Sequence, residues 1–119
     1  MRVLICDDEP SVRLLFRTLA EGAGADVVEA IDGDDCLVQA AAHSPDVVIL
    51  DLFMPGRDGL SGLPDLRATL PDAAVLVVSA HAAVDTFAKS RARGATACFD
   101  KLGFLDHLPE VLTRYTTPA

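Results

Sequence analysis

Residues 47–51 read VVILD, a run of β-branched and leucine residues that ends in an aspartate. Runs of this kind are typical of a strand that is buried on both faces. Similar short runs recur along the chain, and amphipathic stretches separate them. We therefore expect strands at about 2–6, 26–30, 47–50, 74–79 and 97–100. This alternation predicts an α/β domain with a parallel sheet.

The amphipathic stretches predict five helices, with Pro10 and Ser11 starting the first and Gly22, Pro71 and Gly94 as stop signals. The expected core faces are Val12, Leu15, Phe16 and Leu19; Leu37, Ala40 and Ala41; Leu63, Leu66 and Leu70; Val84, Phe87, Ala88 and Ala92; and Leu105, Leu108, Leu112 and Tyr115. Right-handed crossovers leave few ways to connect five such pairs. We expect a doubly wound, flavodoxin-like sheet ordered 2-1-3-4-5, flanked by five helices, with its switch point between the first and third strands.

The composition narrows the class of protein. A chain of 119 residues, half of them apolar, corresponds to one folded domain. The formal charge of −8 argues against direct binding of nucleic acid. Every apolar run is far shorter than the roughly 20 residues of a membrane span, and the N-terminus does not resemble a signal peptide. We expect a cytoplasmic protein. The three cysteines follow no metal or disulfide pattern.

Polar residues follow four of the predicted strands. They are Asp7 with Asp8, Asp51, Ser79 and Lys101. Because ligands bind at the carboxyl ends of parallel strands, we expect these side chains to converge. Crowded carboxylates are unfavourable unless a cation lies among them, and a hard dication such as Mg²⁺ prefers oxygen ligands. The set predicts a metal-assisted phosphoryl site in which Asp51 is the nucleophile.

Each of these residues also has a purely structural interpretation. Asp7 and Asp8 fit the N-terminal cap of a helix. Asp51 fits a structural ion pair with Lys101, and Ser79 fits a loop cap. The functional interpretation rests on their joint placement at neighbouring strand ends.

Four motifs carry a resemblance to a known family. They are DDEP at 7–10, DLFMPGRDG at 51–59, Ser79-Ala80, and Gly94-Ala95 followed by Lys101. In this order and spacing the chain resembles bacterial response-regulator receiver domains, of the chemotaxis-type single-domain kind, over residues 1–119. The resemblance implies a non-enzymatic phosphoacceptor in a two-component phosphorelay, without an output domain in this chain. Gly59 fits the family's turn before the third helix.

The resemblance assigns a role to each acidic residue. Asp51 would be the phosphoacceptor and a metal ligand, Asp8 a direct ligand of the metal, and Asp7 a ligand through water. The backbone carbonyl of Phe53 would complete the protein's share of the metal sphere. The implied ion is Mg²⁺, with Mn²⁺ as an alternative.

The phosphoryl oxygens would be held by Lys101, by the Ser79 hydroxyl and by the backbone N–H groups of Phe53 and Ala80. In the family, the hydroxyl moves toward the phosphate while an aromatic residue of the fifth strand turns inward. The surface of the fourth helix, fifth strand and fifth helix then changes, and a partner reads it.

The chain departs from the family at two positions. Cys98 stands where the switch aromatic is expected, and Phe99 is no substitute because neighbouring strand residues face opposite sides of the sheet. We expect output to run through the loop from Ser79 to Val84. Leu102 replaces a proline that usually follows the lysine through a cis bond. A cis bond before Leu102 would cost about 3–4 kcal/mol, so we expect a trans bond, with Gly103 absorbing the altered path.

Phe53 and His81 are candidates for tuning the lifetime of the phosphoryl group. They lie two residues beyond Asp51 and Ser79, where the family flanks the approach of the attacking water. A ring at Phe53 would shield the acyl phosphate. The alternative is that Phe53 only packs at the rim of the pocket.

The implied partners are a sensor histidine kinase or a phosphotransfer protein, a downstream protein, and a second copy of the chain. A rival hypothesis is a phosphate-independent interaction module, which the departures at Cys98 and Leu102 favour slightly and which the intact acid pocket, Ser79 and Lys101 oppose strongly. Two enzyme readings fit less well: a phosphatase would place its nucleophile after the first strand in an Asp-x-Asp motif, and a flavin binder would need more aromatic residues in its loops.

Overall fold

The computed structural model describes residues 1–54, 59–80 and 84–116. Strands and helices alternate from end to end. They are β1 (Arg2–Cys6), α1 (Pro10–Gly22), β2 (Asp26–Ala30), α2 (Gly33–His43), β3 (Val47–Asp51), α3 (Gly59–Thr69), β4 (Ala74–Ser79), α4 (Val84–Ala92), β5 (Ala97–Asp100) and α5 (Lys101–Thr116). The strands expected from the sequence are all present, and β3 extends one residue further, to Asp51.

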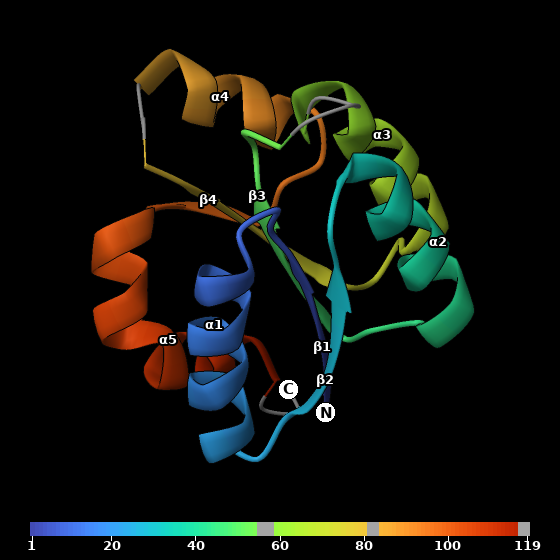
Figure 1. Ribbon diagram of the computed structural model, residues 1–119. Coiled ribbons are helices and arrows are strands. Elements are labelled where there is room, and N and C mark those ends of the chain that lie inside the picture. Colours follow the sequence, from blue (N-terminus) through green and yellow to red (C-terminus); the bar gives the residue numbers. More distant parts are fainter. Residues whose placement is uncertain (55–58, 81–83, 117–119) are drawn as a thin grey trace.

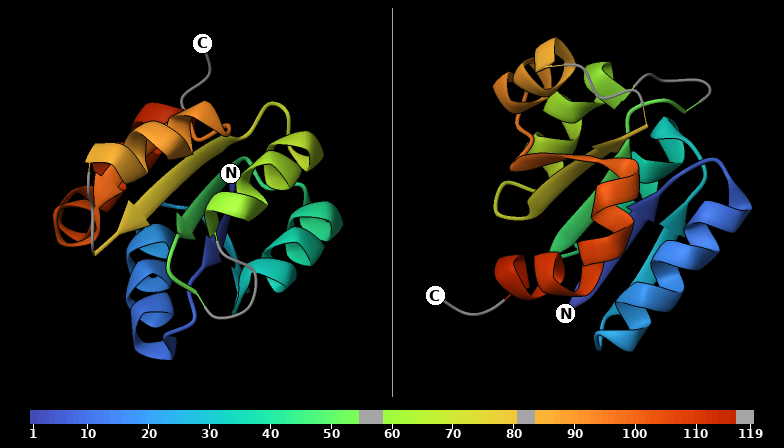
Figure 2. Two further views of the ribbon diagram at one scale, coloured as in Figure 1. Left: turned by 90° about the horizontal axis from the view of Figure 1, so that it is seen from above. Right: turned by 90° about the vertical axis from the view of Figure 1, so that its left-hand side faces the viewer.

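All five strands are parallel and follow the expected order β2-β1-β3-β4-β5. Helices α1 and α5 cover one face of the sheet, and α2, α3 and α4 cover the other (Figure 1). The two further views show the sheet between these layers (Figure 2). Since β1 pairs with both β2 and β3, the chain reverses its winding direction between β1 and β3. This is the predicted switch point.

The sheet separates two apolar cores. The core under α1 and α5 contains Val3, Ile5, Phe16, Ala20, Val27, Val47, Ile49, Leu76, Val78, Phe104, Leu108, Val111 and Leu112. Its aromatic centre is Phe104, which meets Phe16 edge-on at a centroid distance of 5.7 Å and Phe99 at 5.2 Å. The opposite core contains Leu4, Cys6, Ala30, Cys36, Ala40, Val48, Leu50, Leu52, Met54, Leu63, Leu66, Leu70, Val75 and Val77. The alternating residues of each strand divide between the two cores, as a sheet covered on both faces requires.

Of the expected helix-face residues whose burial the structure describes, which leaves out Val84, four are exposed. Leu15 is 46% exposed, and Ala41, Ala88 and Ala92 are also exposed. In α1 the buried residues are Phe16, as expected, and Ala20. Each misplaced residue lies at the edge of an apolar stripe, where the sequence period alone does not settle which neighbour faces the core.

The amino ends of β4 and β5 are tied together by one arginine. Arg67, in the last turn of α3, donates to the carbonyl oxygens of Gly94 (3.0 and 2.8 Å), Leu70 (3.0 Å) and Ala73 (2.6 Å), and to Oγ1 of Thr96 (3.1 Å). A basic residue near a helix C-terminus commonly satisfies free carbonyls in this way. Here it fastens the α3–β4 turn to the α4–β5 turn.

The junction of β5 and α5 is partly as expected. The Lys101–Leu102 peptide is trans. Gly103, however, is an ordinary helical residue and does not absorb a change in path. Oδ2 of Asp100 instead accepts a hydrogen bond from the Gly103 N–H at 3.3 Å, so an aspartate caps the start of α5. Over the described residues, no helix is long and apolar enough to cross a membrane.

Candidate phosphoacceptor site

The register of the sheet brings the predicted polar residues to one edge. Cys6 pairs with Leu50, so the residues that follow, Asp7 and Asp51, lie side by side. Ser79 ends β4 and pairs with Asp100, directly before Lys101. The parallel sheet therefore places side chains from four strand ends along its carboxyl edge.

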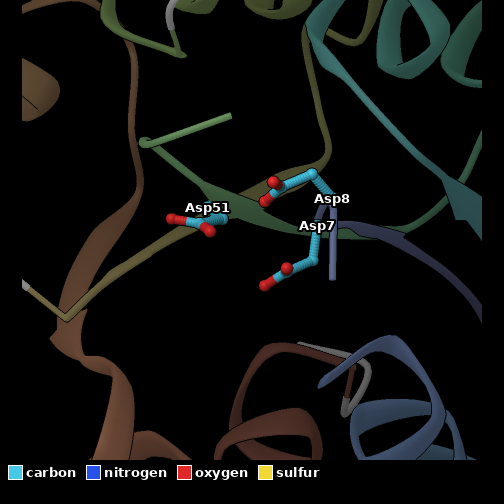
Figure 3. A group of neighbouring side chains, drawn as sticks. All are labelled: Asp7, Asp8 and Asp51. Atoms are coloured by element: carbon cyan, nitrogen blue, oxygen red, sulfur yellow. The ribbon is translucent and has the colours of Figure 1, made fainter. Parts of the chain in front are cut away.

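Three carboxylates gather at this edge. Those of Asp7, Asp8 and Asp51 each offer an oxygen within 4.8 Å of the others. Figure 3 shows the three side chains as close neighbours, Asp7 and Asp8 from the end of β1 and Asp51 from the end of β3. Asp7 is fully buried and Asp51 is 5% exposed, while Asp8 is the most open of the three. Such crowding raises the electrostatic energy of the folded chain, because buried like charges repel and lose hydration.

Lys101 supplies the positive charge at this edge. Its Nζ lies 2.8 Å from Oδ2 of Asp7 and 3.1 Å from Oδ2 of Asp51, to which it donates a hydrogen bond. Burial alone would lower the pKa of Lys101, but the two carboxylates outweigh burial and raise it. Lys101 is therefore charged at neutral pH. One ammonium group does not balance three carboxylates.

Asp51 is destabilised as an anion despite this partner. Burial raises its pKa, and Asp7 adds to the effect, while the Phe53 N–H and Lys101 lower it less. Oδ1 of Asp51 accepts the hydrogen bond from the Phe53 N–H at 3.1 Å. An ion pair with Lys101 thus exists, but it does not offset the cost of burying the charge.

The helix-cap interpretation of the acid pair is wrong. The N-cap residue of α1 is Glu9, and its side chain makes no capping hydrogen bond. The Asp7 side chain reaches forward along the chain, and its Oδ1 accepts from the Glu9 N–H at 3.0 Å. Neither Asp7 nor Asp8 is therefore the cap residue of α1, although Asp7 bonds the residue that is.

The oxygen set fits a hard dication. Oδ2 of Asp7 is buried and accepts no hydrogen bond from the residues that the structure describes. The partner of this oxygen is the ammonium group of Lys101, in ion-pair contact at 2.8 Å. Lys101 shares its charge with Asp51 and does not balance all three carboxylates, so a cation between Asp7, Asp8 and Asp51 would offset their repulsion. Carboxylate oxygens are the ligands that Mg²⁺ uses in proteins.

The remaining site residues lie where the sequence predicts, or outside the described residues. Phe53 follows β3 with 55% of its surface exposed. Ser79 is fully buried at the end of β4, and Ala80 is exposed just beyond it. His81 and residues 55–58 of the DLFMPGRDG motif lie outside the described residues.

Cys98 and Phe99 face opposite sides of the sheet, as expected. Cys98 packs at the edge of the core under α2 and α3, and its Sγ lies 3.6 Å from the carbonyl oxygen of Phe87 in α4. Phe99 packs on the other face, against Phe104. The ring of Phe99 therefore cannot take the place of a switch aromatic at 98.

A polar network lies behind the acid pair, and sequence reasoning missed it. Arg13 of α1 donates to the carbonyl oxygen of Asp7 at 2.7 Å and to Oε1 of Glu29 at 3.1 Å. Arg17 pairs with the other oxygen of Glu29. Charged residues on an amphipathic helix are usually solvated. The only available signal was a glutamate inside the apolar run of β2.

Residues 3–113 match the family described as the response regulator receiver domain. This chain belongs to that family. Its members are signalling modules of two-component systems, and they typically bind Mg²⁺ at an acidic pocket like the one formed by Asp7, Asp8 and Asp51. The fold and the family expected from the sequence are both confirmed.

Known receiver proteins resemble the chain at modest identity. Sporulation initiation phosphotransferase F of Bacillus subtilis is 26% identical over 114 residues, which cover 96% of this chain and 92% of that protein. The DNA-binding transcriptional regulator NtrC of Salmonella typhimurium is 31% identical over 93 residues, or 78% of this receiver but only 20% of NtrC. The chemotaxis protein CheY4 of Vibrio cholerae superposes with a TM-score of 0.87 at 27% identity, covering 96% of this chain and 97% of that one.

Proposed function

We propose that this receiver domain is a phosphorylation-dependent switch that accepts a phosphoryl group on Asp51. The observation that carries the proposal is the convergence of Asp7, Asp8 and Asp51 around a common space, with Lys101 in contact with two of them. Structural ion pairs rarely gather three carboxylates, two of them buried, around one ammonium group.

In the proposed reaction, a carboxylate oxygen of Asp51 attacks the phosphorus atom of the donor. A new O–P bond forms as the bond to the leaving group breaks. When bound, Mg²⁺ supplies positive charge that offsets the repulsion between the carboxylate and the phosphoryl oxygens. Asp8, Asp51 and the Phe53 carbonyl would hold it directly, and Asp7 through water.

The protein's own groups then hold the product. Lys101 would shift from the carboxylate of Asp51, which loses charge as the acyl phosphate forms, toward a phosphoryl oxygen. The Ser79 hydroxyl and the N–H groups of Phe53 and Ala80 would hold the others. At present the Phe53 N–H donates to Asp51 itself, so this donor already faces the reacting carboxylate.

The modified domain would act through protein contacts. We propose that a sensor histidine kinase or a phosphotransfer protein delivers the phosphoryl group in the cytoplasm. A downstream protein or a second copy of the chain would read the face formed by α4, β5 and α5. Because Cys98 offers no ring to rotate, the signal would pass along the Ser79–Val84 loop.

The test is the intact mass after incubation with acetyl phosphate and Mg²⁺. We expect one added phosphoryl group that requires Mg²⁺ and does not form on the Asp51→Asn variant. An adduct on that variant would place the site elsewhere. Failure of the wild type both to form an adduct and to bind Mg²⁺ would reject the proposal.

One observation favours the rival function, a phosphate-independent interaction module. Cys98 stands where the family's switch aromatic is expected, and its Sγ lies 3.6 Å from the carbonyl oxygen of Phe87, so the usual link from β5 to the output face would be lacking. This function predicts partner binding of equal affinity before and after treatment with the phosphodonor. A Cys98→Tyr variant that changes neither phosphorylation kinetics nor partner affinity would show that the cysteine has no part in switching.

A further inference from the structure

Both peptides that flank the α-carbon of Asp7 are held by hydrogen bonds. The N–H of Asp7 donates to the carbonyl oxygen of Ala30 at 3.2 Å, and its carbonyl oxygen accepts from Nη1 of Arg13 at 2.7 Å. The second bond comes from a charged donor and is therefore the stronger kind. The first bond holds the peptide between Cys6 and Asp7, and the second restrains the peptide between Asp7 and Asp8, which joins the two members of the acid pair.

This peptide sets the direction of Asp8. Within the described part of the chain the Asp8 carboxylate accepts no hydrogen bond, so the backbone at Asp8 is the main restraint on where its side chain lies. Asp7 has a further restraint, the bond from the Glu9 N–H. Rotation of the shared peptide would move the Asp8 carboxylate away from Asp7 and Asp51.

Arg13 is itself held in place by Glu29. Nε of Arg13 lies 3.1 Å from Oε1 of Glu29, and only 15% of the arginine side chain is exposed. The other carboxylate oxygen of Glu29 pairs with Arg17, which also bonds Glu21 at 2.9 Å. Glu29 thus neutralises much of the charge that Arg13 brings toward the acid pair. Its carboxylate also orients the planar guanidinium group of Arg13.

We propose that Arg13, held by Glu29, is a positioning residue for the dication, and that it acts by fixing the peptide between Asp7 and Asp8. This inference rests on the proposed function, since it concerns the same metal site. Groups that orient metal ligands from behind typically contribute 10–100-fold to metal affinity. Preorganisation has this effect because the free carboxylates then lose less conformational freedom on binding.

The sign of the effect separates positioning from simple electrostatics. Removing a nearby cation strengthens the attraction of a dication to the carboxylates if only Coulomb forces act. Removing a group that positions the ligands weakens binding. Arg17 provides the matched control, because it shares Glu29 with Arg13 but makes no contact with Asp7.

The experiment measures the dissociation constants of Mg²⁺ and Mn²⁺ by titration calorimetry for the wild type, Arg13→Met and Arg17→Met. We expect the constants of Arg13→Met to rise about tenfold and those of Arg17→Met to stay within about twofold. Arg13→Lys keeps the charge and the apolar stem but cannot reach Asp7 and Glu29 together. If Arg13→Met does not fold, Arg13→Lys still tests the inference. We expect its dissociation constants to lie between those of the wild type and those of Arg13→Met.

Three results would overturn the inference. Unchanged or tighter binding by both Arg13 variants would show that the arginine does not position the pair. Equal losses in Arg13→Met and Arg17→Met would assign the effect to the ion-pair network as a whole. If the wild type itself binds neither ion, the proposed function fails and this inference fails with it, whereas the first two results leave the proposed function standing.

Discussion

The carbonyl oxygen of Gly94 accepts two hydrogen bonds from Arg67, at 3.0 Å from Nε and 2.8 Å from Nη2. Gly94 has a φ of +115°, and a Cβ built on it would lie 2.9 Å from Cβ of Arg67. Both the backbone conformation and the close approach require glycine. This contact joins the end of α3 to the turn before β5, at the amino edge of the sheet.

Replacing Gly94 by alanine is therefore expected to destabilise the fold. Strain at positive φ and the clash with Arg67 together cost at least about 2 kcal/mol. The measurement is urea unfolding followed by far-ultraviolet circular dichroism. Gly103→Ala is the control, because Gly103 is helical and alanine there is expected to stabilise by about 0.5–1 kcal/mol. Equal stability of the two variants would contradict the role assigned to the contact.

Asp51→Asn is expected to stabilise the domain at pH 7. Because burial raises the pKa of Asp51 in the folded state, the charged form is disfavoured there. The native state binds the proton more tightly than the unfolded chain, so this group stabilises the fold only at low pH and costs free energy once ionised. Removing the charge is expected to raise stability by about 1 kcal/mol, or roughly 4 °C in Tm.

The difference in Tm between the wild type and Asp51→Asn is expected to depend on pH. As the pH falls through the raised pKa of Asp51, the wild type becomes neutral at this position, and its Tm should approach that of Asp51→Asn. Scanning calorimetry from pH 7 to pH 4 measures the difference. The exposed residue Asp106 offers a control, for which Asp106→Asn should show no comparable gain. A lower Tm for Asp51→Asn at pH 7 would refute the account.

The three thiols are expected to react at two very different rates. Cys6 and Cys36 are 1% and 3% exposed, and burial raises the pKa of Cys6 well above its usual range, with Cys36 adding to the effect. Cys98 is only partly buried; burial raises its pKa too, and Arg91 partly opposes this. Since the thiolate is the reactive form, Cys98 should react first and faster at higher pH.

A disulfide reagent that releases a coloured thiol measures this directly. We expect one equivalent from the native protein and three in denaturant, with the native reaction lost in Cys98→Ser. Three equal rates under native conditions would mean that the core around Cys6 and Cys36 is more accessible than the structure shows.

Phe53→Asn is expected to shorten the lifetime of the phosphorylated state, if the proposed function holds. The ring is half exposed two residues beyond Asp51, and its loss would open the acyl phosphate to water. A barrier lower by about 1 kcal/mol speeds hydrolysis about fivefold. Loss of the adduct over time, followed by intact mass, measures the half-life. Val38→Asn removes an apolar residue that is 62% exposed on α2 and should change nothing. An unchanged half-life for Phe53→Asn would leave Phe53 as packing at the rim.

The strands and their polar ends could be predicted because both depend on local pattern. A run such as VVILD determines its own conformation, and the parallel sheet then determines where Asp51 lies relative to Asp7. The helix faces were harder to predict. Leu15 and Phe16 are equally apolar, and the packing of α1 against β2 and α5 decides that only Phe16 is buried.

Long-range polar contacts could not be predicted from pattern. Arg67 reaches residues 27 and 29 positions away, and Arg13 reaches Glu29 across the β1–β2 connection. In a single sequence such residues are indistinguishable from solvated charges. At the start of α5, the trans bond before Leu102 could be predicted from local energetics. The capping hydrogen bond of Asp100 could not.

The fastening by Arg67 lies at the amino ends of β4 and β5, whereas Asp51, Ser79 and Lys101 lie at the carboxyl ends of β3 and β4 and just beyond β5. One edge of the sheet is thus fastened by hydrogen bonds, and the other carries charges that repel each other. A change in charge at the site therefore acts on strands β4 and β5, which Arg67 joins at their amino ends. If the proposed function holds, the residues that join β4 to β5 at their amino ends are distinct from the residues that accept the phosphoryl group. A substitution at the site is then expected to change phosphorylation without breaking the hydrogen bonds of Arg67.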